Sequence, residues 1–285
     1  MAGFCWIHPE FRELAAQHQL GDLNALLARD DGTPVSPHHR RRDIVRLELP
    51  DRSGRLTTLY LKRDWDVRWR YLARQLRYRQ SLWTPARTEL ETLLHLAAAG
   101  VAVPRPVACV QRLGWRGQGG LILEAVPSAV TLNHYLATTL RDAGPRQREQ
   151  LFAQLGRELA RLHNSGVHQP RLFSTKIYLA DAAADENDTP VIGFWGFRQA
   201  IRCQPLPFSY RVAGLAALLA TLPGRLASVR EREILFDAYL AVADLDHRGM
   251  ALPQAVGRQV ERLLTNRHIW EIRESDTEEH RSVRP

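Results

Sequence analysis

The sequence predicts an α+β protein with two lobes, in which a strand-rich first part of the chain is followed by a helical second part. Two observations favour this order. Residues 43–62 alternate apolar and polar side chains on both sides of a turn, which is typical of a β-hairpin. In residues 145–164, and in most of 211–272, apolar side chains instead recur at the spacing of an amphipathic helix. The length of 285 residues suits two lobes or one large domain.

The hairpin is the best-defined element of the strand-rich part. Residues 1–30 predict one or two short amphipathic helices, and a polar, cationic loop follows them. The first hairpin strand covers residues 43–49, where the alternation is regular. A turn at residues 51–54 leads into the second strand, residues 56–62, which ends at Lys62.

A basic amphipathic helix is predicted for residues 64–79. Its apolar positions step by four, three and four residues and so share one face; they are Trp65, Trp69, Leu72 and Leu76. Arg70, Arg74 and Arg77 lie on the opposite face. This pattern fits a helix packed on the first lobe with solvated arginines. It also fits a patch for anionic lipid or for a phosphate-bearing sugar at a membrane face.

A second helix is predicted from Pro85 to Gly100. Thr84 is a suitable N-cap, and a proline is favoured in the first turn. Gly100 can end the helix in the left-handed conformation. Strands then follow near residues 101–106 and at residues 120–124, where the chain is apolar.

The character of the chain changes at a predicted hinge near residues 125–131. A capping box from Ser228 to Glu231 marks the start of one helix beyond it. We therefore expect three parts: a strand-rich N-terminal lobe at residues 1–125, a helical C-terminal lobe at residues 126–274, and a charged, frayed tail at residues 275–285.

The composition limits the classes of partner and compartment. A net charge of +8 favours anionic partners, such as phosphorylated sugars, anionic lipid or nucleic acid. Cys5, Cys109 and Cys203 lie far apart without the spacing of a metal site or disulfide framework, which favours a reducing cytosol. We expect no signal peptide. The longest apolar run, residues 212–222, is about half of the roughly 20 residues that span a bilayer.

Lys62 and Lys176 are the two lysines of a chain with 39 lysines and arginines in total. Lys62 ends an apolar strand, and a lysine at such a place can hold nucleotide phosphates when a glutamate on the next helix pairs with it. Glu89 is the predicted partner, because it shares a helix face with Leu93 and Leu96. The alternative is a solvated strand-end lysine and a first-turn glutamate favoured by the helix dipole.

The run from Thr84 to Pro106 resembles the lipopolysaccharide core kinase family, which phosphorylates heptose or Kdo sugars. The matching residues are Ala86, Arg87, Thr88, Glu89, Leu93, Leu96, Gly100, Val101, Pro104 and Pro106. Lys62 matches the strand-end lysine of that family, and residues 166–179 resemble its catalytic loop. The resemblance covers about residues 40–225 and implies a protein-kinase-like fold of two lobes.

The resemblance also shows replacements at the positions that carry the chemistry. The family reads glycine, two residues, then His-Arg-Asp; here Gln169 replaces the histidine and Arg171 the catalytic aspartate. Lys176 replaces a metal-binding histidine or asparagine, and Gly193 replaces a metal-binding aspartate at a strand end. Arginine does not act as a base in proteins, and glycine has no side-chain oxygen for magnesium. We therefore expect no catalytic residue and no metal ligand at these four degenerate positions.

These features predict a pseudokinase with a binding or regulatory role in cell-envelope polysaccharide assembly. The resemblance implies ATP or ADP binding, and the replaced positions predict that this binding does not use magnesium; the residues implied are Lys62, Glu89, Glu124, Arg171 and Lys176. The expected partners are an anionic phosphorylated glycolipid or anionic membrane surface and an envelope-assembly protein. We expect a cytoplasmic location, peripheral at the inner membrane.

Two alternatives remain open. One is an active ATP-dependent sugar kinase whose carboxylate is relocated; the acidic residues concerned are Asp181, Asp185, Glu186 and Asp188. The other is a basic nucleic-acid-binding protein. No nucleic-acid-binding motif or aromatic stacking platform is present in the sequence, so we expect no specific nucleic-acid partner.

Overall fold

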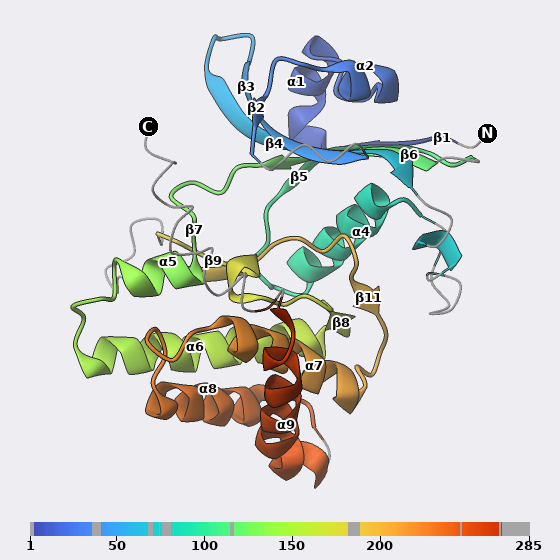
Figure 1. Ribbon diagram of the computed structural model, residues 1–285. Helices are drawn as coiled ribbons and strands as arrows, with labels where there is room; N and C mark the ends of the chain where they lie inside the picture. Colours follow the sequence, from blue (N-terminus) through green and yellow to red (C-terminus); the bar gives the residue numbers. More distant parts are fainter. Residues whose placement is uncertain are drawn as a thin grey trace. The chain divides into compact units, whose positions relative to one another are not determined.

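The computed structural model describes residues 3–35, 41–67, 71–73, 75, 81, 83–114, 117–181, 189–245, 247–267 and 269. The chain forms two compact units (Figure 1). The first unit comprises Met1–Ala97, Val103–Val126 and Gly196–Ala200. The second unit comprises Ala98–Ala102, Pro127–Trp195 and Ile201–Pro285. One short segment late in the sequence, Gly196–Ala200, thus belongs to the N-terminal unit.

A six-stranded antiparallel sheet forms the centre of the first unit, in the order β1-β5-β6-β4-β3-β2. Its strands are β1 (Gly3–Ile7), β2 (Thr33–Pro34), β3 (Arg42–Pro50), β4 (Leu56–Val67), β5 (Pro106–Arg112) and β6 (Gly117–Glu124). The predicted hairpin is confirmed, since β3 pairs with β4 and places Ile44 opposite Lys62. Strand β1 was not predicted, because its five residues are too short to show a period; it pairs with β5.

The two faces of this sheet carry different helices (Figure 1). A 3₁₀ turn (Pro9–Phe11), α1 (Arg12–Gln17) and α2 (Leu23–Ala28) agree with the short helices predicted for residues 1–30. They cover one face of the sheet, where Leu26 of α2 shares a hydrophobic core with Leu59 and Leu61 of β4. Side chains alternate between faces along a strand, so Lys62 and Asp64 project from the other face. The helix α4 (Pro85–Ala98) lies on that side.

The structure corrects the start of the predicted basic helix at residues 64–79. Strand β4 continues to Val67, because Asp64 still pairs with Gly119 on one side and the Trp65 N–H donates to the Arg41 carbonyl on the other. Trp65 is therefore a strand residue. Residues 71–73 and 75 are helical. The remaining positions of the predicted faces, including the arginine face at 70, 74 and 77, lie outside the described residues.

The helix that follows agrees with the prediction. It starts at Pro85, directly after Thr84, and Gly100 takes a positive φ of 73° just beyond its end. Leu90, Leu93 and Leu96 are buried. Its first turn approaches the sheet closely, since a Cβ on Gly119 would lie 2.9 Å from the Thr84 hydroxyl. Glycine at this point of β6 is what permits the approach.

The second unit is mainly helical. Its helices are α5 (Leu132–Ala137), α6 (Pro145–Asn164), α7 (Phe208–Thr221), α8 (Val229–Val242) and α9 (Leu252–Leu264), with 3₁₀ turns at Ser174–Lys176 and His247–Ala251. Small strands complete it: β7 (Val130–Thr131), β9 (Ile177–Ala180) and β10 (Val191–Phe194) in one sheet, and β8 (Val167–His168) with β11 (Ile201–Arg202) in another. The predicted helix at 145–164 and the capping box at Ser228 are confirmed. The predicted tail at 275–285 lies outside the described residues. None of the described helices is long and apolar enough to cross a bilayer.

Helices α6 and α8 pack very closely at Gly156. A Cβ at this position would lie 2.3 Å from the Leu235 carbonyl oxygen, which belongs to the α8 backbone. We expect Gly156→Ala to lower the free energy of unfolding by about 2–3 kcal/mol, because the two helices must separate. Gly257→Ala is the control, since a Cβ in that part of α9 meets nothing within 4 Å; it should be neutral or stabilising by up to about 1 kcal/mol. Urea denaturation of both variants checks this, and equal stability would contradict the packing argument.

A polar network lies in the core of the second unit. The His163 ring nitrogen Nδ1 lies 2.8 Å from the Tyr239 hydroxyl, and Arg211 donates to the same hydroxyl at 3.2 Å. His163 is fully buried. Burial, together with the positive charge of Arg211, lowers the pKa of His163 to about 3.

His163 should therefore make stability depend on pH. The unfolded chain binds a proton on this histidine near pH 6.5, whereas the folded protein does not until about pH 3. The free energy of unfolding should fall as the pH falls through this window, by about 2 kcal/mol between pH 6.5 and pH 5. His163→Gln should remove that part of the pH dependence. Urea denaturation at both pH values measures it, and identical pH slopes in the two proteins would contradict the assignment.

Candidate functional site

Lys62 and Glu89 meet on the α4 side of the sheet. The Lys62 Nζ lies 2.6 Å from Glu89 Oε1, and the side chains are 18% and 3% exposed. Strand β4 presents the lysine, and the first turns of α4 present the glutamate. A buried carboxylate without a partner is costly, so each residue holds the other in place. The structure thus brings together the two residues that the sequence suggested as a pair.

Glu89 has a second donor, which comes from the segment Gly196–Ala200. The backbone N–H of Phe197 donates to the same oxygen, Oε1, at 3.2 Å. The Phe197 ring is fully buried. The backbone carbonyl of Phe197 accepts from the Ala200 N–H at 3.0 Å. Sequence reasoning missed Phe197, since 108 residues separate it from Glu89. The available signal was a glycine followed by a phenylalanine after a strand.

A second ion pair lies on the same face of β4. Asp64 is two residues beyond Lys62, and its carboxylate accepts from the Arg198 guanidinium. The Asp64 side chain is 7% exposed and that of Arg198 is 28% exposed. Burial raises the pKa of the Asp64 carboxyl above its usual range, and the charge of Arg198 opposes that rise. Neither residue was singled out from the sequence.

Glu124 does not join this site. It pairs with Leu59 across β4 and β6, so its side chain lies on the sheet face opposite to that of Lys62. Its carboxylate accepts from Arg105 Nε at 2.7 Å, and Arg105 also contacts Glu10. The side chains of Glu124 and Lys62 therefore lie on opposite faces of the sheet, and a part for Glu124 in nucleotide binding stays a prediction.

The loop that resembles a catalytic loop lies in the second unit. It begins after Gly166, whose φ is +79° and whose Cβ would lie 2.6 Å from the Cys203 carbonyl oxygen. Gln169 is buried and donates through Nε2 to the Trp195 carbonyl at 3.0 Å. Arg171 is exposed. Lys176 is the last residue of a 3₁₀ turn that leads directly into β9.

The backbone of this loop is anchored to α7. The Ser174 N–H donates to the Thr221 hydroxyl at 3.0 Å, and the Ser174 hydroxyl donates to the Thr221 carbonyl at 3.0 Å. Gln169, Arg171 and Lys176 have the spacing of the kinase motif H-R-D-x-x-x-x-N. The prediction that cationic side chains replace the base and a metal ligand rests on this spacing.

The structure offers Gly196 as a second candidate for the metal position that the sequence assigned to Gly193. Gly193 lies inside β10 opposite Tyr178, and a Cβ there would lie 2.2 Å from the Tyr178 ring. An aspartate at this point of the strand would require the Tyr178 side chain to move. In the kinase motif D-F-G the acidic residue follows the strand and precedes a phenylalanine. Gly196 precedes the buried Phe197, so it is the better counterpart; it too has no carboxylate.

A replacement carboxylate is not evident in the described part of the chain. There, no group of three or more His, Cys, Asp or Glu side chains is arranged to hold a metal ion. Asp181 is exposed at the end of β9. The other three acidic residues considered for this role, at 185, 186 and 188, lie outside the described residues.

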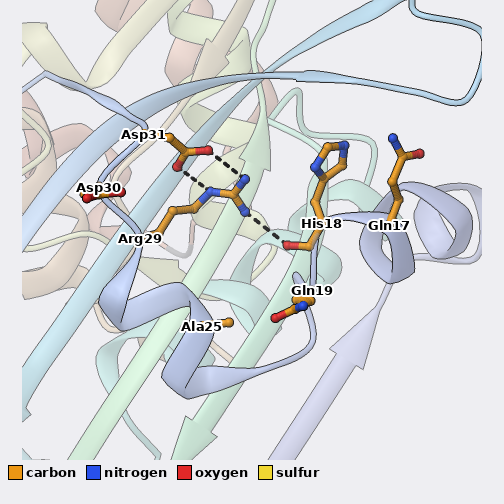
Figure 2. A pocket seen from close by; sticks show the side chains of 7 residues that line it. All are labelled: Gln17, His18, Gln19, Ala25, Arg29, Asp30 and Asp31. Carbon is orange, nitrogen blue, oxygen red and sulfur yellow. Dashed lines mark hydrogen bonds and ion pairs between the residues drawn. The ribbon is translucent and has the colours of Figure 1, made fainter.

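An open polar pocket lies beside α1 and α2, on the sheet face opposite to that of Lys62 (Figure 2). It is lined by Gln17, His18, Gln19, Ala25, Arg29, Asp30 and Asp31. Arg29 donates to both oxygens of Asp31, at 2.6 and 2.9 Å, and to the His18 carbonyl at 3.1 Å. The hydrogen bond from Arg29 lowers the pKa of Asp31. Arg29 and Asp31, which both line this pocket, therefore pair with each other.

Three comparisons with known proteins place the chain. A family model described as lipopolysaccharide kinase (Kdo/WaaP) matches residues 27–199. The 3-deoxy-D-manno-octulosonic acid kinases of Vibrio parahaemolyticus serotype O3:K6 and Vibrio cholerae serotype O1 are 33% identical over 94 residues and 32% identical over 102 residues. These stretches cover 33% and 35% of this chain, and 37% and 41% of the relatives.

A solved structure, titled WaaP in complex with acyl carrier protein, has a TM-score of 0.68 at 17% identity. It covers 91% of this chain and 99% of that chain. This similarity confirms the predicted fold class, a protein-kinase-like α+β fold with an N-terminal antiparallel sheet and a helical C-terminal part.

Proposed function

Because the chain belongs to the lipopolysaccharide kinase (Kdo/WaaP) family, we propose that it is a pseudokinase that binds a nucleotide and acts as a binding or regulatory partner in cell-envelope polysaccharide assembly. The observation that carries the proposal is a contrast within one chain. The Lys62–Glu89 pair is formed and largely buried, whereas the positions of the base and the metal ligands hold Arg171, Lys176 and Gly196.

The proposed loss of phosphoryl transfer follows from the types of side chain at the positions of the base and the metal ligands. Phosphoryl transfer in kinases needs a carboxylate to orient and deprotonate the acceptor hydroxyl, and ligands that hold magnesium on the phosphates. Arg171 keeps its proton in a protein, so it does not serve as the base. Lys176 and Arg171 carry the charge of a cation and do not coordinate one. Gly196 offers no side-chain ligand at all.

The residues that remain suit a nucleotide phosphate. The ammonium of Lys62 has three N–H donors, and its contact with Glu89 uses one of them. Glu89 is buried and fixes the direction of the lysine, while the lysine keeps 18% of its side chain exposed. Charge-assisted hydrogen bonds to phosphate oxygens are among the stronger polar contacts. ATP or ADP is therefore the proposed ligand class.

The net charge of +8 supports an anionic partner as well as an anionic ligand. We propose a phosphorylated glycolipid or an anionic membrane surface as that partner. A protein partner in envelope assembly is a further proposal. The relative of similar fold was solved in complex with acyl carrier protein, so that carrier is the first protein to test with this chain.

Nucleotide affinity in a Lys62→Ala variant tests the binding step. We expect calorimetry with ATP to show at least about tenfold weaker binding than for the natural protein, because a charge-assisted hydrogen bond contributes about 1.5–3 kcal/mol. Arg161→Ala is the matched control; it removes an exposed arginine paired with Glu158 on α6 and should leave the affinity unchanged. No ATP binding by the natural protein, or equal affinity in Lys62→Ala, would refute the proposed site.

A further inference from the structure

The segment Gly196–Ala200 is held on the first unit at three points. The Phe197 N–H donates to Glu89 at 3.2 Å. The Arg198 carbonyl lies 3.0 Å from the Tyr71 hydroxyl. The Arg198 guanidinium contacts the Asp64 carboxylate. One of these contacts therefore ends on Glu89, the α4 residue that pairs with Lys62. Another ends on Asp64, which lies on the same face of β4 as Lys62.

The third contact depends on both partners being charged. Asp64 is 5% exposed, so its ionised form is costly unless a cation accompanies it. Burial raises the pKa of Asp64, and Arg198 is the main charge that opposes the rise. If Arg198 were absent, Asp64 would either take up a proton or move toward water. In both cases the segment would lose its strongest attachment.

Gly196 adds no side-chain contact to this segment. It has a φ of +85°, and glycine has the widest conformational freedom of any residue. A side chain at this position could have fixed the segment, but glycine has none. The next residue carries the N–H that donates to Glu89, and its position is held by the buried Phe197 ring and by the Arg198 ion pair.

We propose that Asp64 and Arg198 are a positioning pair that keeps the Phe197 N–H on Glu89 and thereby keeps Lys62 in its phosphate-binding orientation without a metal ion. The last step rests on the proposed nucleotide site. Glu89 Oε1 accepts from both Lys62 and Phe197, so it keeps one fixed place between them. Loss of the Phe197 donor leaves a buried carboxylate with fewer partners and lets it shift. The ion pair thus acts on Lys62 through Phe197 and Glu89.

Amide hydrogen exchange of Phe197 in the free protein, without nucleotide, tests the positioning step. We expect Arg198→Gln to make this amide exchange at least tenfold faster, and Arg198→Lys to keep it within about threefold of the natural protein, which corresponds to about 0.65 kcal/mol. Arg105→Gln is the matched control, because it removes an exposed arginine of the same unit that pairs with Glu10 and Glu124. It should leave the Phe197 amide unchanged.

Two further results separate positioning from general stability. In Arg198→Gln, amides of α6 such as that of Leu155 should keep their protection, and Asp64→Asn added to Arg198→Gln should cause little further loss, since the two residues act as one unit. Unchanged Phe197 exchange in Arg198→Gln, or equal acceleration of the Phe197 and Leu155 amides, would overturn the proposal. If Arg198→Gln folds poorly, Arg198→Lys decides the question. This variant keeps the positive charge, so fast exchange of its Phe197 amide would also overturn the proposal.

ATP affinity measured on the same proteins distinguishes this inference from the proposed function. If the natural protein binds ATP, Arg198→Gln should bind it at least fivefold more weakly, while Arg105→Gln should not. Unchanged ATP affinity in Arg198→Gln would overturn the link from the ion pair to Lys62. If the natural protein binds no ATP but Phe197 exchange responds as expected, the proposed function fails and the positioning of Phe197 by Asp64 and Arg198 stands.

Discussion

Purified protein is expected to transfer no measurable γ-phosphate from ATP to lipopolysaccharide that contains heptose or Kdo. A general base contributes about 10²–10⁴-fold to such a rate, and we propose that Arg171 stands at the position of the base. In the same proposal, Lys176 and Gly196 take the places of the metal ligands that neutralise the phosphates. We therefore expect a rate at least about 10⁴-fold below that of an active member of the family.

The measurement is transfer of labelled phosphate in the presence of magnesium, with one of the Vibrio 3-deoxy-D-manno-octulosonic acid kinases assayed beside this protein. A trace of contaminating kinase is recognised because it persists in Lys62→Ala. Turnover that survives purification and disappears in Lys62→Ala would show an active kinase with a carboxylate from elsewhere. Asp181 would then be the first described residue to replace.

The parts of the fold that depend on local pattern were predictable. The alternation of residues 43–62 and the turn between them specify the hairpin that ends near Lys62, and Thr84, Pro85 and Gly100 mark the two ends of α4. These two elements carry Lys62 and Glu89, so their pairing could be suggested from the sequence alone. The end of β4 was not predictable, because Trp65 also fits the helical spacing of the residues after it. Pairing with β6, which is distant in sequence, and with the start of β3 makes Trp65 a strand residue.

The rest of the candidate site depends on contacts that no local pattern reports. Asp64 and Arg198 are 134 residues apart, and each alone reads as a surface charge. Gly193 and Gly196 are both followed by an aromatic residue, Phe194 and Phe197, so the sequence alone does not choose between them. The pairing of β10 with β9 places Gly193 opposite Tyr178, whereas Gly196 lies beyond the end of β10.

Nucleotide binding by the natural protein is expected to be independent of magnesium, or weakened by it. A kinase uses magnesium to neutralise the triphosphate, and we propose that Lys176 and Gly196 stand where its ligands would be. Lys62 supplies positive charge without a metal, and the cations Arg171 and Lys176 repel a metal from the loop that carries them. Calorimetry with ATP, in magnesium and in EDTA, should therefore give affinities that agree or that favour EDTA.

A reconstructed metal site should reverse this behaviour. We expect the combined change Arg171→Asp, Lys176→Asn and Gly196→Asp to make ATP binding at least about a hundredfold tighter in magnesium than in EDTA, which is about 2.8 kcal/mol. Aspartate tolerates the positive φ of position 196 better than most residues do, so the fold should survive the change. The matched control replaces Gly196→Asp by Gly193→Asp. It carries the same charge but directs a carboxylate into the Tyr178 ring, so it should lose stability and gain no magnesium dependence. Magnesium-dependent binding by the natural protein would contradict the prediction and would require a metal ligand at a position other than Arg171, Lys176 and Gly196.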